Sequence, residues 1–287
     1  MTGSRSGLTS RSSRSSGRHS PRPKKRFGQH FLSDRNILNR IVDAAEVAPD
    51  DAVVEIGPGL GALTEVLAER ASRVVAVEVD ADLVAVLGER LANAPNVAIV
   101  AADVLDVAAS AILRHGGAGA PYVVVANLPY NIAAAVLRHF LEGDVPPRRL
   151  VVMVQQEVAE SIVARPQKMS LLGVATQAYG ETSMVMRVAP GAFNPPPAVQ
   201  SAVVRIDVAD RPRVDAPLDV FFRVVRAGFG NPRKQLRNSL SFGMHVKQEV
   251  ADEVLHDAGI DVTLRPQVLS LEQWAALARA WDRAMRR

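Results

Sequence analysis

Hydrophobic and polar positions along this 287-residue chain follow two different periods. Short, mostly apolar runs rich in valine and isoleucine alternate with longer segments whose apolar residues recur every three or four positions. The short runs fit strands buried on both faces, and the longer segments fit amphipathic helices. We expect strands over residues 52–57, 73–80, 97–103, 122–127, 149–155, 182–189 and 200–208.

The predicted helices lie between these strands. "SDRNILNRIVDAAEVAP" has an apolar helical stripe, with Ser33 or Asp34 as the capping residue and Pro49 after its end. Helices over 60–71 and 81–94 follow the first two strands, and the glycine-rich segment 115–121 is a loop. Strands that alternate with helices in this way predict a doubly wound α/β domain with a parallel sheet.

Past Asp210 the strand pattern ends and every segment has a helical period. The segments are "LDVFFRVVRAGF", "RKQLRNSL", "QEVADEVLHDAG" and "LEQWAALARAWDRAMRR". We therefore expect an α/β domain over residues 24–208 and a small all-helical domain over residues 209–287.

The charge is unevenly distributed along the chain. Residues 1–26 hold eight Lys/Arg and no acid, residues 27–208 carry a net charge of −7, and residues 209–287 carry +3. This asymmetry favours a polyanionic partner held at the two ends of the chain. Residues 1–23, rich in Ser, Arg and Gly, predict a disordered basic tail. We favour an RNA-tethering arm over an organelle transit peptide, because the tail lacks the apolar residues of an amphipathic helix.

Composition excludes several classes of protein. The chain has no cysteine, so it can form neither a disulfide nor a thiolate metal site. Its six histidines lack the spacing of zinc enzymes, and we expect no metal. Its apolar runs are too short to span a membrane, so we expect a soluble, cytoplasmic protein.

The glycine-rich stretch "EIGPGLGALT" connects a predicted strand to a helix, where open α/β sheets bind ligands. Gly57, Gly59 and Gly61 leave room for a ligand to touch the backbone. Glu78 and Asp103 end the next two strands, where carboxylates could accept from ribose hydroxyls and an adenine amino group. Sites for dinucleotides and for S-adenosylmethionine share this pattern. The alternative is that these are ordinary turn glycines and solvated acids at strand ends.

Details of this loop favour S-adenosylmethionine over a dinucleotide. The spacing is G-x-G-x-G rather than G-x-G-x-x-G. Pro58 also removes a backbone N–H, which is a poor choice where a pyrophosphate needs hydrogen-bond donors. We therefore predict S-adenosylmethionine as the cofactor.

The motif "NLPY" ends the fourth predicted strand, and it contains no acid, base or thiol. The Asn127 side-chain oxygen and the Leu128 carbonyl could accept hydrogen bonds from an exocyclic amine of a nucleobase and expose its lone pair for methylation. Pro129 stiffens the turn, and the ring of Tyr130 offers a stacking face worth about 1–3 kcal/mol. The alternative is a plain turn after a strand.

Phe193 stands in the proline-stiffened loop "AFNPPP". Three prolines stiffen this loop, and we expect an exposed ring there that meets a ligand. The alternative is a ring that fills the core beneath the loop.

These motifs together resemble the ribosomal RNA adenine N6-dimethyltransferase family, most closely its bacterial small-subunit (16S) branch. The resemblance covers residues 24 to about 280. It rests on "KKRFGQHFLSD", "EIGPGLGALT", "VAVEVD", "AADVLD", "NLPY", "MVQQEVA", "AFNPPPAVQSAVV" and "FFRVVRAGFGNPRKQLRNSL".

The resemblance implies an S-adenosylmethionine-dependent methyltransferase domain of the Rossmann-like class I type and a helical RNA-binding domain. The implied cofactor-binding residues are His30, Leu32, Gly57, Glu78, Asp103 and Asn127. The implied target site is Asn127, Leu128, Pro129 and Tyr130, closed by Phe193. The implied reaction makes N6,N6-dimethyladenosine at two adjacent adenines near the 3′ end of 16S rRNA, during biogenesis of the small subunit. We expect a monomer that acts on that subunit or its precursor.

The basic segment "RKQLRNSL" is predicted to bind RNA. In a helix, Arg233 and Arg237 share one face and Lys234 flanks them. The alternative is a solvated basic face.

The chain departs from the family pattern at Asn131 to Ala134, including Ala133, and at Ala198, Gln200 and Pro232. These departures bear on RNA affinity or rate rather than on the transfer site. Three rival functions remain: a macrolide-resistance type 23S rRNA adenine methyltransferase, a non-catalytic rRNA-binding assembly factor, and a dinucleotide oxidoreductase.

Overall fold

The computed structural model describes residues 30–129 and 132–286. The predicted tail over residues 1–23 and the aromatic ring of Tyr130 lie outside this range.

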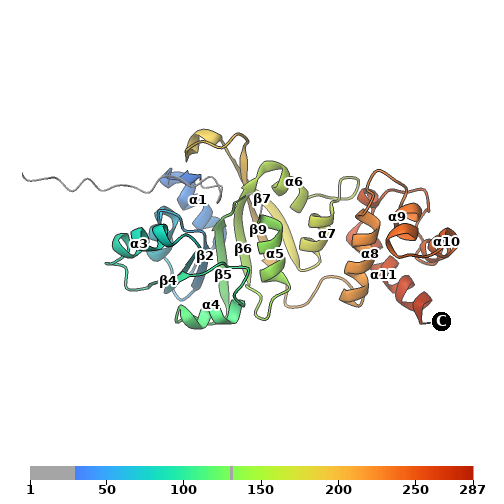
Figure 1. The fold of residues 1–287 in the computed structure, drawn as a ribbon, viewed down its shortest axis with the longest axis horizontal. Helices are drawn as coiled ribbons and strands as arrows, with labels where there is room; N and C mark the ends of the chain where they lie inside the picture. The colour runs from blue at the N-terminus through green and yellow to red at the C-terminus, as the bar shows by residue number, and fades with distance from the viewer. Residues whose placement is uncertain (1–29, 130–131, 287) are drawn as a thin grey trace, which may run out of the picture.

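Within the described residues, a seven-stranded sheet has the order β4-β3-β2-β5-β6-β9-β7 (Figure 1). Its strands are β2 (Ala52–Ile56), β3 (Arg73–Glu78), β4 (Val97–Ala101), β5 (Tyr122–Asn127), β6 (Arg149–Gln155), β7 (Gly180–Val188) and β9 (Ser201–Val208). The strands β4, β3, β2, β5 and β6 are parallel, whereas β9 pairs antiparallel with β6, and β7 pairs antiparallel with β9. The doubly wound α/β fold is therefore confirmed.

Helices cover both faces of the sheet. They are α1 (Arg35–Ala45), α2 (Ala62–Ala68), α3 (Ala81–Arg90), α4 (Ala109–His115), α5 (Ala133–Leu141), α6 (Gln156–Ile162) and α7 (Leu171–Gln177). Alternate strand residues belong to two separate cores: Val53 and Val123 pack with α1 and α2, whereas Val54 and Val124 pack with α4, α5 and α6. Burial on both faces explains why the strands read as continuous apolar runs.

The predicted first helix is confirmed, with Asp34 as its cap. The Asp34 carboxylate accepts hydrogen bonds from the backbone amides of Asn36 and Ile37 at 2.9 and 3.4 Å. Leu38, Ile41, Val42 and Ala45 form the buried stripe. The helix ends at Ala45, and the next residue, Glu46, turns the chain away with a φ of +47°.

Several predicted boundaries were too long. The strand predicted over 73–80 ends at Glu78, because the Glu78 carboxylate binds the backbone amides of Val79 and Asp80 and turns the chain. The helix predicted over 60–71 begins only at Ala62, because Gly61 precedes it with a φ of +83°. The pattern also missed α4 and the two-residue strands β1 (Phe31–Leu32) and β8 (Phe193–Asn194), which pair antiparallel.

The C-terminal region is all-helical, as predicted, with α8 (Leu218–Phe229), α9 (Leu236–Gly243), α10 (Gln248–Asp257) and α11 (Leu271–Met285). Figure 1 shows these helices as a block beyond α7. Its core contains the fully buried Trp274 and Trp281 and also takes in Ala164, Met169, Val174 and Ala178 from before residue 209. The division at residue 208 stays a prediction.

The segment "RKQLRNSL" is helical only from Leu236 onwards. Arg233 and Lys234 precede α9 in a turn closed by the hydrogen bond from the Lys234 amide to the Asn231 carbonyl. The prediction that Arg233 and Arg237 share a helix face was therefore wrong. This turn, which also contains Pro232, ends before α9 starts at Leu236.

Candidate active site

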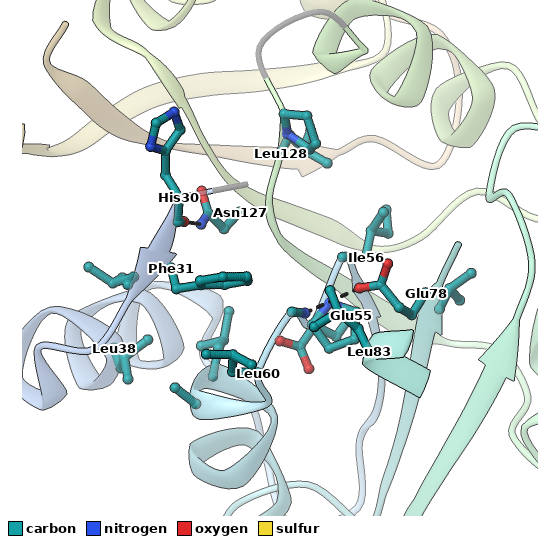
Figure 2. Close-up of a pocket in the computed structure, with 18 of the residues that line it drawn as sticks. His30, Phe31, Leu38, Glu55, Ile56, Leu60, Glu78, Leu83, Asn127 and Leu128 are labelled. Atoms are coloured by element: carbon teal, nitrogen blue, oxygen red, sulfur yellow. Dashed lines mark hydrogen bonds between the residues drawn. The ribbon is translucent and has the colours of Figure 1, made fainter. Parts of the chain in front are cut away.

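A cavity of about 500 Å³ lies at the carboxyl ends of β2, β3 and β5 (Figure 2). The strand order reverses here, because β3 and β5 lie on opposite sides of β2. This is the place where doubly wound sheets bind ligands. Most of the predicted cofactor and target residues line it: His30, Leu32, Gly57, Gly59, Glu78, Asp103, Asn127, Leu128, Pro129 and Phe193.

The glycine loop after β2 needs its glycines. Gly57, Gly59 and Gly61 have φ values of +66°, +60° and +83°, a region that other residues rarely adopt. A Cβ atom at Gly59 would also lie 3.1 Å from the ring of Phe31, which is tighter than a normal contact. At Gly57 and Gly59 the loop therefore presents backbone rather than side chains to the cavity.

Glu78 is held firmly at the end of β3. Its side chain accepts hydrogen bonds from the amides of Val79 and Asp80 at 3.0 and 2.9 Å, and from the amide of Gly59 at 3.3 Å. Burial raises the pKa of this carboxyl, and the backbone amides oppose that rise. The acid thus faces the cavity with one oxygen already tied to the glycine loop.

Glu55 is the site residue that the sequence interpretation missed. It lines the cavity from within β2 and is only 1% exposed, and its Oε2 has no hydrogen-bond partner among the described residues. Burial raises its pKa to about 8, and the nearby Glu78 charge adds to this effect. The signal in the sequence was one acid inside an otherwise apolar strand, which is costly unless it has a use.

Asp103 lies two residues beyond the end of β4 rather than at its last position. It is exposed and lines the cavity, and its Oδ1 accepts a hydrogen bond from the Leu105 amide at 3.0 Å. The predicted strand over 97–103 ends at Ala101, so a short turn rather than the sheet holds this carboxylate.

Asn127 is the last residue of β5 and lies beside the glycine loop. Ile56 and Ala126 are register partners, and a Cβ atom at Gly57 would lie 3.9 Å from the Asn127 carbonyl oxygen. The Leu128 amide donates to the Met153 carbonyl at 3.0 Å, which extends the sheet pairing one residue further. The chain then turns at Pro129, and the predicted ring of Tyr130 lies outside the described residues.

The strands β1 and β8 bring two distant segments over the cavity. Leu32 pairs with Phe193 and Phe31 with Asn194, and Nδ1 of His30 lies 2.9 Å from the Pro195 carbonyl oxygen. Phe193 is only 6% exposed, because it packs in the core that contains Leu32 and Met186. The expectation of an exposed ring at Phe193 was wrong, although the residue does line the cavity.

The three predicted RNA-binding residues differ in their surroundings. Arg233 and Lys234 are exposed and have no acidic partner among the described residues. Arg237 lies in α9 and forms an ion pair with Asp252 of α10 at 2.9 Å. Its charge is therefore partly engaged inside the helical region.

The described residues contain neither a metal-binding cluster nor a helix able to span a membrane. In that part of the chain, no group of three or more His, Asp or Glu residues is arranged to hold a metal ion. Nor is any helix there long and apolar enough to cross a membrane.

Comparison with known proteins places these features in a family. The model of the family "Ribosomal RNA adenine dimethylase" matches residues 21–277. Proteins named ribosomal RNA small subunit methyltransferase A are 45% identical over 255 residues in Dehalococcoides mccartyi strain CBDB1, and 42% identical over 264 residues in Bacillus thuringiensis strain Al Hakam. These alignments cover 88% and 90% of this chain, and 87% and 90% of the relatives.

Solved structures agree with this placement. The 23S rRNA methyltransferase ErmE has a TM-score of 0.69 and 29% identity, covering 88% of this chain and 99% of its own. A dimethyladenosine transferase from Plasmodium falciparum shares the fold, with a TM-score of 0.74, 21% identity and coverage of 89% and 98%. The chain belongs to the ribosomal RNA adenine dimethylase family.

Proposed function

We propose that this protein transfers methyl groups from S-adenosylmethionine to N6 of two adjacent adenines near the 3′ end of 16S rRNA. The product is N6,N6-dimethyladenosine, made during biogenesis of the small ribosomal subunit. Family membership supports adenine dimethylation, and the relatives at 42–45% identity carry small-subunit names. We further propose that a monomer does this in the cytoplasm, where the subunit is assembled.

The hydrogen-bonding groups of the cavity fit S-adenosylmethionine. Glu78 would accept from ribose hydroxyls, and Asp103 would accept from an adenine amino group. Gly57 and Gly59 leave backbone exposed, where a side chain at Gly59 would already be crowded by Phe31. His30, Leu32 and Asn127 complete the proposed lining. When bound, S-adenosylmethionine supplies an electrophilic methyl group.

The chain's own residues act on the acceptor amine. The lone pair of an exocyclic adenine amine is delocalised into the ring, so the amine is a poor nucleophile. The Asn127 side-chain oxygen and the Leu128 carbonyl would accept hydrogen bonds from this amine and favour a tetrahedral nitrogen. No side chain needs a shifted pKa for this step, because alignment and hydrogen bonding lower the barrier.

An adenine can reach Asn127 only after leaving its own stack. We propose that Tyr130 and Phe193 stack on its two faces. For Phe193 this proposal requires that the ring, now packed beside Leu32, face the base in the complex. The RNA itself would be held by Arg233, Lys234 and Arg237 of the helical region, with the basic residues 1–23 as an added tether.

The observation that supports this function best is the position of Asn127 at the end of β5, beside Gly57 and in the same cavity as Glu78. Asn127→Ala should abolish methyl transfer while S-adenosylhomocysteine binds within a few-fold of wild type, because Asn127 acts mainly in the transition state. Single-turnover methylation and calorimetry measure the two effects. A near-wild-type rate would refute this role of Asn127.

The second candidate function is methylation of 23S rRNA, which the similarity to ErmE favours. Incubating the protein with undermethylated small and large subunits, and then mapping dimethyladenosine in each rRNA, separates the two. Product in 16S rRNA alone supports the proposal. Product in 23S rRNA alone supports the rival, and no product with either subunit would indicate a non-catalytic assembly factor.

A further inference from the structure

The amide of Asn127 has only one orientation that fits its surroundings. Its Nδ2 donates a hydrogen bond to the His30 backbone carbonyl oxygen at 3.2 Å, drawn as a dashed line in Figure 2. A carbonyl oxygen can only accept, so this contact selects the end of the amide that carries nitrogen. The side-chain oxygen is thereby left free to accept from another group.

The position of the His30 carbonyl is set by a different part of the chain. His30 immediately precedes β1, which pairs with β8 in the register Phe31 to Asn194 and Leu32 to Phe193. The imidazole adds a second tie, through Nδ1 to the Pro195 carbonyl oxygen at 2.9 Å. The carbonyl that meets Asn127 is therefore anchored to the Phe193 loop.

The same segment also reaches the cofactor side of the cavity. The ring of Phe31 lies against the glycine loop, at 3.1 Å from the position of a Cβ atom at Gly59. Residues 30–32 therefore touch the glycine loop, the end of β5 and the Phe193 loop. Among the described residues that line the cavity, only this segment pairs with β8.

We propose that the backbone carbonyl of His30 is a positioning group for methyl transfer, because it holds the Asn127 amide with its oxygen available to the target amine. This inference rests on the proposed role of Asn127. The terminal torsion of asparagine has two nearly equivalent settings that exchange oxygen and nitrogen. In the wrong setting, the NH₂ group would meet the NH₂ of adenine, donor against donor. The contact with His30 excludes that setting.

The substitution Asn127→Asp tests this directly, because it keeps the shape and replaces the donor by an acceptor. An ionised carboxylate would place oxygen against the His30 carbonyl oxygen, and the two would repel. A protonated carboxyl could donate its O–H to His30 and still accept from the amine through its other oxygen. Transfer by this variant should therefore improve as the pH falls.

The expected result is a single-turnover rate at pH 8 at least 100-fold below wild type. The ratio of the variant rate to the wild-type rate should rise at least tenfold between pH 8 and pH 5.5. The ratio is the useful quantity, because the ionisable side chains of His30, Glu55, Glu78 and Asp103 line the same cavity and are common to both proteins. Asn127→Ala has neither donor nor acceptor, so its rate should stay at background at both pH values.

The opposite outcome is equally clear. If His30 does not orient the amide, a carboxylate should accept from the amine at least as well as an amide does. Asn127→Asp would then be nearly as active as wild type at pH 8, or its ratio would not change with pH, and either result overturns the inference. Wild-type protein that fails to methylate any rRNA would instead refute the proposed function itself.

A measurement without cofactor or RNA provides a second readout. The side-chain NH₂ signal of Asn127 can be assigned in the nuclear magnetic resonance spectrum by its loss in Asn127→Asp. We expect its protons to exchange with water at least tenfold more slowly than those of an exposed asparagine such as Asn238. Exchange as fast as that of Asn238 would show that the bond to His30 does not hold the amide.

Discussion

Glu78 and Gly59 are joined by a hydrogen bond of 3.3 Å from the Gly59 backbone amide to the Glu78 carboxylate. The acid at the end of β3 therefore positions the glycine loop after β2. A ligand in the cavity meets both groups as one unit, so loss of the carboxylate should disturb the loop as well as remove an acceptor.

Glu78→Ala should weaken S-adenosylhomocysteine binding more than tenfold. Two ribose hydroxyls would lose a charged acceptor, and hydrogen bonds to charged groups contribute about 1.5–3 kcal/mol. Glu78→Gln keeps an acceptor without the charge and should fall between Ala and wild type. Calorimetric titration measures this, with Glu89→Ala, an exposed acid on α3, as the matched control. An unchanged dissociation constant for Glu78→Ala would contradict the assignment.

Stability should depend on pH through Glu55. Its pKa is about 8 in the folded protein against an ordinary 4.5, so the folded state retains a proton that the unfolded state releases. Stability should therefore fall as the pH rises from about 4.5 to about 8. The free energy of unfolding should fall by roughly 1.4 kcal/mol for each pH unit between these two pKa values.

Glu55→Gln removes this titration. The melting temperature of the variant minus that of wild type should be larger at pH 8.5 than at pH 5. Any constant cost of burying an amide at this position cancels in that comparison. A difference that does not vary with pH would show that Glu55 ionises normally.

Phe193 can be tested by separating its volume from its aromatic face. Phe193→Leu keeps most of the apolar contact with Leu32, whereas Phe193→Ala should also destabilise the fold by about 3–5 kcal/mol. We expect Phe193→Leu to melt near the wild-type temperature but to methylate at least tenfold more slowly, because base stacking contributes about 1–3 kcal/mol. A wild-type single-turnover rate for Phe193→Leu would mean that the ring only fills the core.

The parts of the fold that could be predicted are those with local causes. The stripe from Leu38 to Ala45 and the cap at Asp34 depend on residues within a few positions of each other, and both were found. Gly57 and Asn127 could be placed together because parallel neighbouring strands end at one edge.

Other features depend on long-range packing that no local pattern reports. The pairing of Leu32 with Phe193 spans most of the chain through two strands of two residues each, too short to show a period. It is this pairing that buries Phe193. The ion pair of Arg237 with Asp252 likewise depends on how α9 packs on α10, so the sequence could not show that Arg237 differs from Arg233.

Because Arg237 is paired with Asp252, we expect Arg233 and its neighbour Lys234 to contribute more to RNA binding than Arg237 does. Arg233 and Lys234 lie exposed in the turn before α9, without acidic partners among the described residues. Replacing both by glutamate should weaken binding to the immature small subunit. It should also reduce the dependence of log affinity on log salt by about 1.4–1.8, the value for two lost phosphate contacts.

The melting temperature and S-adenosylhomocysteine affinity should stay unchanged in that double variant, because neither residue supports the core or the cavity. The matched control replaces Arg40 and Arg114 by glutamate, which changes the net charge equally through exposed residues of α1 and α4.

Arg237→Gln should behave differently, because it breaks the ion pair with Asp252. It should lower the melting temperature, and it should change the salt dependence less than the loss of Arg233 does. Binding against potassium concentration decides between these outcomes. If the double variant and wild type have equal slopes, the RNA is held by another surface, and if the control loses as much as the double variant, the effect is one of net charge alone.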